Sequence, residues 1–251
     1  MKKFLAIILG VLICLSVSMF TACNSTTFDG KYQETSATTI SSFSEQVDES
    51  GNEDLDYASG IKTFMDLEIG ADGQTMHTKN TMYFSLKDGE IAMQGNVSVK
   101  AKALGFSIST TAKIYYSDGY LYYNGKAMGI TAKYKQAMNI EELIGQYGSG
   151  NGLSQIKLSD ALIEYNSDTT KFYIETGDDI TKIKIDYQAE GIKMKMYFIF
   201  NESYILQAFK IDMQSSFDGT TIKGTIYAEQ WDGEVTLPSN LDSYADEMPA
   251  L

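Results

Sequence analysis

Side chains that usually carry covalent or metal chemistry are scarce in this sequence of 251 residues, which has one histidine and two cysteines. His77 stands between Met76 and Thr78 on the polar positions of an alternating run, so we expect it to face solvent. The sequence contains no G-x-S-x-G turn for a nucleophile and no H-E-x-x-H or paired-cysteine spacing for zinc. We therefore predict no catalytic residue, no cofactor and no metal site. A hydrolase or other enzyme stays an alternative, and a histidine-based one would have to recruit His77.

The clearest chemical prediction concerns Cys23. A basic start and an apolar stretch over residues 4–20 precede Thr21 and Ala22, which stand directly before this cysteine. That order is typical of a bacterial lipoprotein signal, which is cleaved so that the cysteine becomes the lipidated N-terminus. The apolar stretch is also about long enough to be kept as a membrane anchor, which is the alternative. In both cases the rest of the chain lies outside the cytoplasm and is tethered to a membrane.

Charge and composition exclude several functions. The chain has 33 acidic side chains and 20 basic ones, all of them lysines, and a net charge of -13. Arginine usually supplies bidentate recognition of phosphate, so an acidic chain without arginine is a poor candidate for binding nucleic acid. The same charge should repel anionic lipids, so we expect the lipid anchor to hold the protein at the membrane.

Hydrophobic periodicity predicts a sheet with a few helices. A helix is expected over residues 37–48, where Ile40, Phe43 and Val47 fall at helical spacing. Period-two alternation over residues 61–114 and 171–228 indicates antiparallel hairpins. Turns are predicted at Ala71-Asp72-Gly73, Lys87-Asp88-Gly89, Ser117-Asp118-Gly119, Asn124-Gly125, Gly177-Asp178, Asn201-Glu202 and Asp218-Gly219. Residues 134–165 are expected to interrupt the sheet with two helices.

Methionine is frequent on the apolar positions of these strands. Its side chain is flexible and polarizable, which suits surfaces that accept varied apolar partners, although methionine also fills gaps in ordinary cores. We predict that the following side chains line an apolar ligand site: Met65, Met82, Met93, Met194, Met196, Phe198 and Met213.

Two runs in the chain resemble small lipoproteins of Gram-positive bacteria: I-Y-Y-S-D-G-Y-L-Y-Y-N-G over residues 114–125, and G-E-V-T-L-P-S-N-L-D-S-Y over residues 233–244. Those proteins are similar in fold to the lipoprotein carrier LolA and the mycobacterial lipid-binding lipoproteins LppX and LprG. The resemblance covers most of residues 60–245. It implies a strongly curved antiparallel half-barrel with helices across its concave side and an apolar cavity between them, and it implies no catalytic residue.

The sequence therefore predicts an α+β protein whose half-barrel has about 10–12 strands and a few helices on its concave face. Residues 1–22 are the expected signal peptide, residues 23–30 the lipidated cysteine and tether, and residues 31–251 a single LolA-like domain. The expected function is binding or carrying a lipid or other apolar ligand, as a monomer on the extracytoplasmic face of the cell membrane. The alternative is a structural or interaction lipoprotein with a filled core and no ligand.

Overall fold

The computed structural model describes residues 28–50, 60–87, 90–103, 106–127, 130–139, 168–177 and 179–246. The predicted signal peptide, Cys23 and most of the expected helices in 134–165 lie outside these residues. Within the described ranges no helix is both long and apolar enough to cross a membrane.

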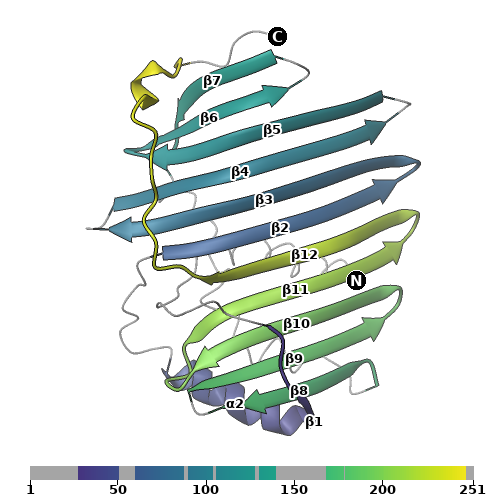
Figure 1. Ribbon diagram of the computed structural model, residues 1–251. Coiled ribbons are helices and arrows are strands. Elements are labelled where there is room, and N and C mark those ends of the chain that lie inside the picture. Colours follow the sequence, from purple (N-terminus) through teal and green to yellow (C-terminus); the bar gives the residue numbers. More distant parts are fainter. Residues whose placement is uncertain are drawn as a thin grey trace.

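The described part of the chain forms one twelve-stranded antiparallel sheet with one α-helix, α2 (Ala37–Ser50), and is mostly β (Figure 1). The strands are β1 (Gln33–Thr35), β2 (Gly60–Ala71), β3 (Gln74–Lys87), β4 (Glu90–Ala103), β5 (Phe106–Ser117), β6 (Tyr120–Ala127), β7 (Ile130–Ala137), β8 (Thr170–Thr176), β9 (Ile180–Ala189), β10 (Ile192–Asn201), β11 (Leu206–Phe217) and β12 (Thr220–Gln230). A short 3₁₀ turn, η1 (Leu241–Ser243), follows them.

Two meanders make up the sheet, whose order is β1-β8-β9-β10-β11-β12-β2-β3-β4-β5-β6-β7. The pairing of β12 with β2 joins them, and Tyr227 lies opposite Phe64 in that pair. Lys62 on β2 reinforces the junction, because its Nζ lies 2.6 Å from Oε1 of Glu229 on β12. Residues far apart in the sequence thus share one continuous ladder.

Tight turns follow the predicted Asp-Gly signals. Asp72, Asp118 and Asp218 have φ values of 50°, 53° and 48°, and the glycine after each has φ between 74° and 76°. Two consecutive positive φ angles are what a two-residue hairpin of the right twist requires, and glycine adopts them without a Cβ clash. These three predicted turns are confirmed.

The predicted turn at Asn124-Gly125 is wrong, because both residues lie inside β6, paired with Lys133 and Ala132 of β7. The Tyr123 ring packs directly against Gly125, because a Cβ at this position would lie 2.5 Å from that ring. The expected interruption also starts too early, because residues 134–137 belong to β7.

Alternation along the strands places the apolar side chains on one face of the sheet. The strand register keeps the apolar positions aligned across the junction of β12 with β2. Met196 lies opposite Ile211, Ile211 opposite Ile226, and Ile226 opposite Met65. We call this the apolar face and the opposite one the polar face. The C-terminal segment 231–246 crosses the polar face (Figure 1), where Trp231 contacts Tyr83 and Tyr244 contacts Tyr122.

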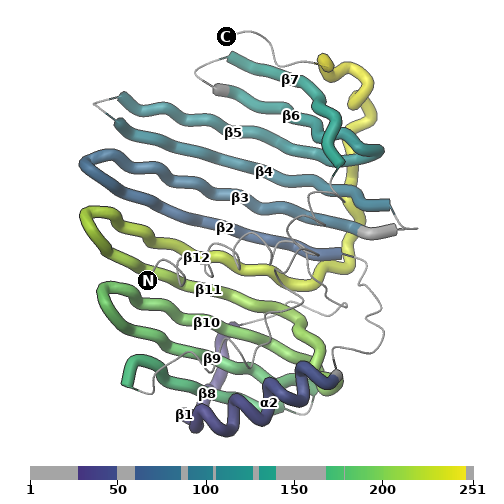
Figure 2. Tube along the Cα trace, turned by 180° about the vertical axis from the view of Figure 1, so that it is seen from behind, coloured from purple at the N-terminus to yellow at the C-terminus, as the bar shows by residue number. Residues whose placement is uncertain are grey.

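Helix α2 confirms the predicted helix and extends it by two residues. Ser36 caps it, because its Oγ accepts a hydrogen bond from the Thr39 N–H at 3.1 Å. Ile40 is fully buried in the cluster with Phe172 and Ile183, and Figure 2 shows from behind that α2 lies at the β8–β9 side of the sheet. The helix therefore covers strands β8–β10 and leaves the β2–β7 half to other contacts.

The predicted strongly curved half-barrel is wrong, because the sheet is open and not strongly curled. Bulges and register shifts are what bend a sheet sharply. The described ladders contain one such shift, between Ile199 and Phe200. A sheet built from long ladders in regular register twists without closing. This explains why the sheet is open, whereas the resemblance implied a strongly curved half-barrel.

Candidate ligand-binding face

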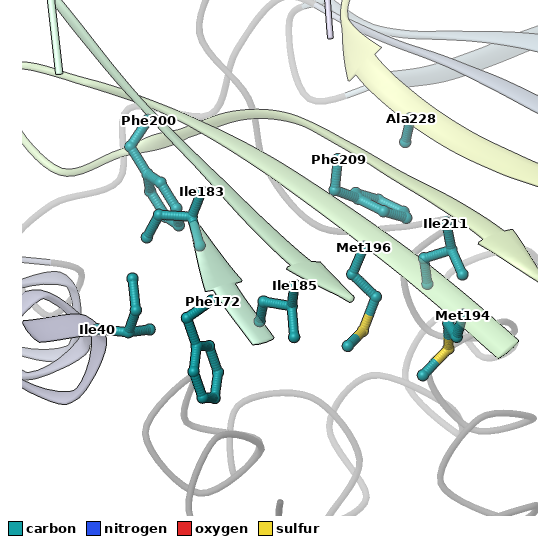
Figure 3. Packing of buried hydrophobic residues seen from close by; sticks show 10 residues of the cluster. All are labelled: Ile40, Phe172, Ile183, Ile185, Met194, Met196, Phe200, Phe209, Ile211 and Ala228. Carbon is teal, nitrogen blue, oxygen red and sulfur yellow. The ribbon is translucent and has the colours of Figure 1, made fainter. Parts of the chain in front are cut away.

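All seven residues predicted to line an apolar site lie on the apolar face, but they belong to two different groups. Met194, Met196, Phe198 and Met213 belong to, or pack against, the cluster beneath α2 (Figure 3). Met82 and Met93 belong to a second cluster that includes Tyr116. Met65 lies between them, opposite Ile226 on one side and Asn80 on the other.

The cluster beneath α2 is closely packed. Figure 3 shows Ile40 of the helix directed toward Phe172 and Ile183 of the sheet, with Met196 beside Ile185 and Met194 beside Ile211. Met194 is 4% exposed and Met196 8% exposed. These two methionines are therefore core residues in this structure.

The second cluster lies around Met93, which is 5% exposed. Met82 fills the space above Gly95 on the neighbouring strand, where a Cβ would collide with its sulfur. Met82 is only partly buried, unlike Met93. This half of the face is therefore packed locally and is less enclosed than the half under α2.

Toward the hairpin ends the apolar face becomes exposed. Leu67, Ile69 and Val99 are half-buried, whereas Met76 is 43% exposed and Ile108 45% exposed. Cross-strand pairing connects them, because Ile69 lies opposite Met76 and Ala101 lies between Met76 and Ile108. An apolar track thus crosses β2–β5 from Ile69 through Met76 and Ala101 to Ile108, while Thr78 lies between Leu67 and Val99.

On the polar face, lysines and aromatic rings alternate across the strands. One row contains Tyr173, Lys184, Tyr197, Lys210, Tyr227 and Phe64, each opposite the next. Lys184 Nζ lies 4.1 Å from the centroid of the Tyr173 ring, and Lys210 Nζ lies 5.3 Å from that of Tyr197. Such cation–π contacts let a face with few apolar residues remain ordered.

Two open grooves lie on the polar face. The larger has a volume of about 890 Å³ and carries Lys171, Lys193, Lys195 and Lys223. The smaller, of about 510 Å³, crosses β3–β7 and has three lysines and no acidic residue in its lining. The alternation along each strand indicates that these groove-lining side chains lie on the polar face. Only the pairing register between strands shows which of them are neighbours, so sequence reasoning missed both grooves.

The first described residues also pack on the polar face. Phe28 contacts the rings of Tyr197 and Tyr227, and the carbonyl of Asp29 accepts a hydrogen bond from Lys182 Nζ at 2.8 Å. Burial in this contact, together with the nearby charges, raises the pKa of Tyr32 to about 12. Residues 28–30, expected as part of a free tether, thus lie against the sheet.

Asp66 links two strands between the grooves. His77 Nε2 donates to Asp66 Oδ1 at 2.6 Å, and Lys79 Nζ lies 3.1 Å from Asp66 Oδ2. The hydrogen bond from His77 lowers the pKa of Asp66 below its ordinary value; burial opposes this and Lys79 adds to it. His77 therefore has a hydrogen-bond partner in Asp66, and within the described residues no group of three His, Cys, Asp or Glu side chains could hold a metal.

Because the folded pKa of Asp66 is depressed, its contribution to stability is present above the unfolded pKa and is lost as the pH falls through the folded pKa. We expect Asp66→Asn to lower the free energy of unfolding by about 0.5–1 kcal/mol at pH 7, as for a partly exposed ion pair. Urea melts at several pH values should show the difference disappearing in acid. Asp72→Asn, at a turn that also suits asparagine, is the control, and an equal loss there would contradict this account.

Comparisons with known proteins give little support for any family. No family model matches the sequence, and no curated protein matches it. A crystal structure of a DUF1329 family protein from Desulfovibrio piger is distantly similar: 9% identity, 79% of this chain and 95% of that one covered, and a TM-score of 0.25. A likeness this weak says nothing about function, so function has to be argued from the two faces of the sheet.

Proposed function

We propose that this chain is a non-enzymatic lipoprotein, anchored through Cys23 on the extracytoplasmic side of a bacterial cell membrane, that binds a lipid or other apolar ligand on its apolar face. It would act as a monomer without a cofactor. The observation that carries the proposal is the apolar track from Ile69 across Met76 and Ala101 to Ile108, in which Met76 and Ile108 are more than 40% exposed. Exposed apolar side chains in a continuous row often mark a binding site.

The track matches an acyl chain in chemistry. A saturated chain gains about 0.8 kcal/mol for each methylene that leaves water, so eight methylenes would contribute about 6 kcal/mol before the cost of ordering. Half-buried Leu67, Ile69 and Val99 offer further apolar contacts, and Thr78 lies between Leu67 and Val99 on the same face. The predicted residue Met65 lies two positions before Leu67 on the same face of β2, whereas Met82, Met93, Met194 and Met196 lie in the two packed clusters of that face.

The tight packing of three methionines favours the second candidate, a structural or interaction lipoprotein with a filled core. Met93, Met194 and Met196 are each no more than 8% exposed. In that case the exposed track would be an ordinary surface, and apolar molecules would not bind to it.

A binding experiment separates the two candidates. We expect the double variant Met76→Ser/Val99→Ser to bind a fluorescent fatty acid about tenfold more weakly than the wild type, because two apolar contacts are lost. Ile180→Ser, a change at a 40% exposed residue on the polar face, is the matched control and should bind normally. Absent binding by the wild type, or equal binding by the double variant, would contradict the proposal.

A further inference from the structure

Lysines are concentrated in one part of this acidic chain. Residues 90–137, which span β4–β7, contain six lysines and two acidic residues, whereas the whole chain has 20 lysines and 33 acidic residues. The register places all six lysines on the polar face, since Lys100 lies opposite Ser109, Lys113 opposite Asn124, and Asn124 opposite Lys133. The polar face of β4–β7 is therefore locally positive, although the net charge of the chain is negative.

The end of the sheet at the β4–β5 and β6–β7 turns combines these lysines with exposed apolar side chains. Phe106 is 76% exposed, Ile130 53% and Ile108 45%, and the three lie on the apolar face close to these turns. Lys100, Lys102 and Lys126 lie on the polar face of the same strand ends and are exposed. We call these six residues the basic-apolar end; Figure 1 shows the corresponding ends of β4–β7 on the right.

The lysines of the basic-apolar end are available to an outside partner. None of Lys100, Lys102 and Lys126 forms an ion pair with a described residue, in contrast to Lys62 and Lys79. The two acids of this region, Glu90 and Asp118, lie at the opposite end of the strands. The described turns at the same end of the other hairpins carry an acid instead: Asp72, Glu190 or Asp218.

We propose that the basic-apolar end inserts into the headgroup region of an anionic lipid bilayer, so that these ends of strands β4–β7 face the membrane. Lysines at the surface attract anionic headgroups, and the neighbouring Phe and Ile side chains leave water for the acyl boundary. A soluble polyanion would use the lysines but gain nothing from Phe106 and Ile130. This inference rests on the proposed membrane anchoring. It specifies which end of the sheet, and therefore which end of the apolar track, contacts the bilayer.

The test uses the full-length chain in phosphatidylglycerol vesicles whose acyl chains carry bromine, which quenches nearby tryptophan. Wild-type protein gives the baseline, because its single tryptophan, Trp231, follows β12 at the other end of the strands. Phe106→Trp and Ile130→Trp should be quenched about threefold more than the control Ile180→Trp, because interfacial side chains lie about 5–10 Å deep. Ile180 is also exposed, but it lies at the opposite strand end.

Charge dependence completes the test. Replacing Lys100, Lys102 and Lys126 with glutamine in the Phe106→Trp protein should remove most of the extra quenching, and so should phosphatidylcholine vesicles or about 1 M salt. The same glutamine changes at Lys193, Lys195 and Lys223 should leave it unchanged. Quenching of Phe106→Trp no greater than that of Ile180→Trp would overturn the inference. So would lysine-dependent binding of polyphosphate without quenching, and either result would leave the fatty-acid experiment as a separate test of ligand binding.

Discussion

Replacing Phe200 with alanine is expected to lower the free energy of unfolding by about 3–5 kcal/mol, the usual cost of removing a buried aromatic side chain. Phe200 is 2% exposed, and its ring centroid lies 5.1 Å from that of Phe43 in an edge-to-face contact. Because Phe43 belongs to α2, the change leaves a cavity where the helix meets the sheet. Urea denaturation followed by circular dichroism measures the loss directly.

The matched control is Phe217→Ala. Phe217 lies at the end of β11 and is 55% exposed, so its removal should change stability by no more than about 0.5 kcal/mol. Equal losses for the two variants would mean that the cluster beneath α2 is not the core of the protein. It would also remove the reason for assigning Met194 and Met196 to that core.

Gly224→Ala is expected to destabilise the protein by about 1–3 kcal/mol through overpacking. Gly224 lies on β12 opposite Leu67 of β2, at the junction of the two meanders. A Cβ at this position would collide with the main-chain oxygen of Asp66 and lie 2.9 Å from the Leu67 Cα. Backbone atoms of a paired strand cannot move aside as a flexible side chain can, so the two strands must separate locally.

Gly177→Ala provides the comparison for Gly224→Ala. Its Cβ would lie 3.6 Å or more from its nearest neighbours, which is ordinary van der Waals contact. This change should be neutral or stabilise the protein by up to about 1 kcal/mol, because alanine restricts the unfolded chain. A Gly224→Ala protein that melts with the wild type would show that β12 and β2 do not pair as described.

The parts of the fold that depend on local chemistry were predictable from the sequence. Alternation located most strands, Asp-Gly pairs located turns, and Ser36 with the spacing of Ile40 and Phe43 located α2. The pairing of β12 with β2 was not predictable, because the paired residues are separated by about 150 positions and no local signal relates them. The degree of curvature was missed for the same reason, since it depends on register along whole ladders.

The face of the sheet that carries the candidate site was predictable from the sequence, but the exposure of its individual residues was not. Strand phase placed Met65, Met82 and Met213 on the correct face, but it could not show that Met194 and Met196 are buried while Met76 is exposed, because burial depends on tertiary packing. Net charge gave a misleading picture of the surface. It suggests uniform repulsion from anionic lipids, whereas the register gathers Lys100, Lys102 and Lys126 at one strand end.

Native mass spectrometry of the full-length chain, purified from its membrane in mild detergent, tests the proposal of a bound apolar ligand most directly. The proposal predicts a noncovalent lipid-sized mass on the wild type, in addition to any covalent anchor at Cys23. It also predicts that this mass is reduced in Met76→Ser/Val99→Ser and kept in Ile180→Ser. A wild-type protein that carries no noncovalent lipid, and acquires none from vesicles, would contradict it.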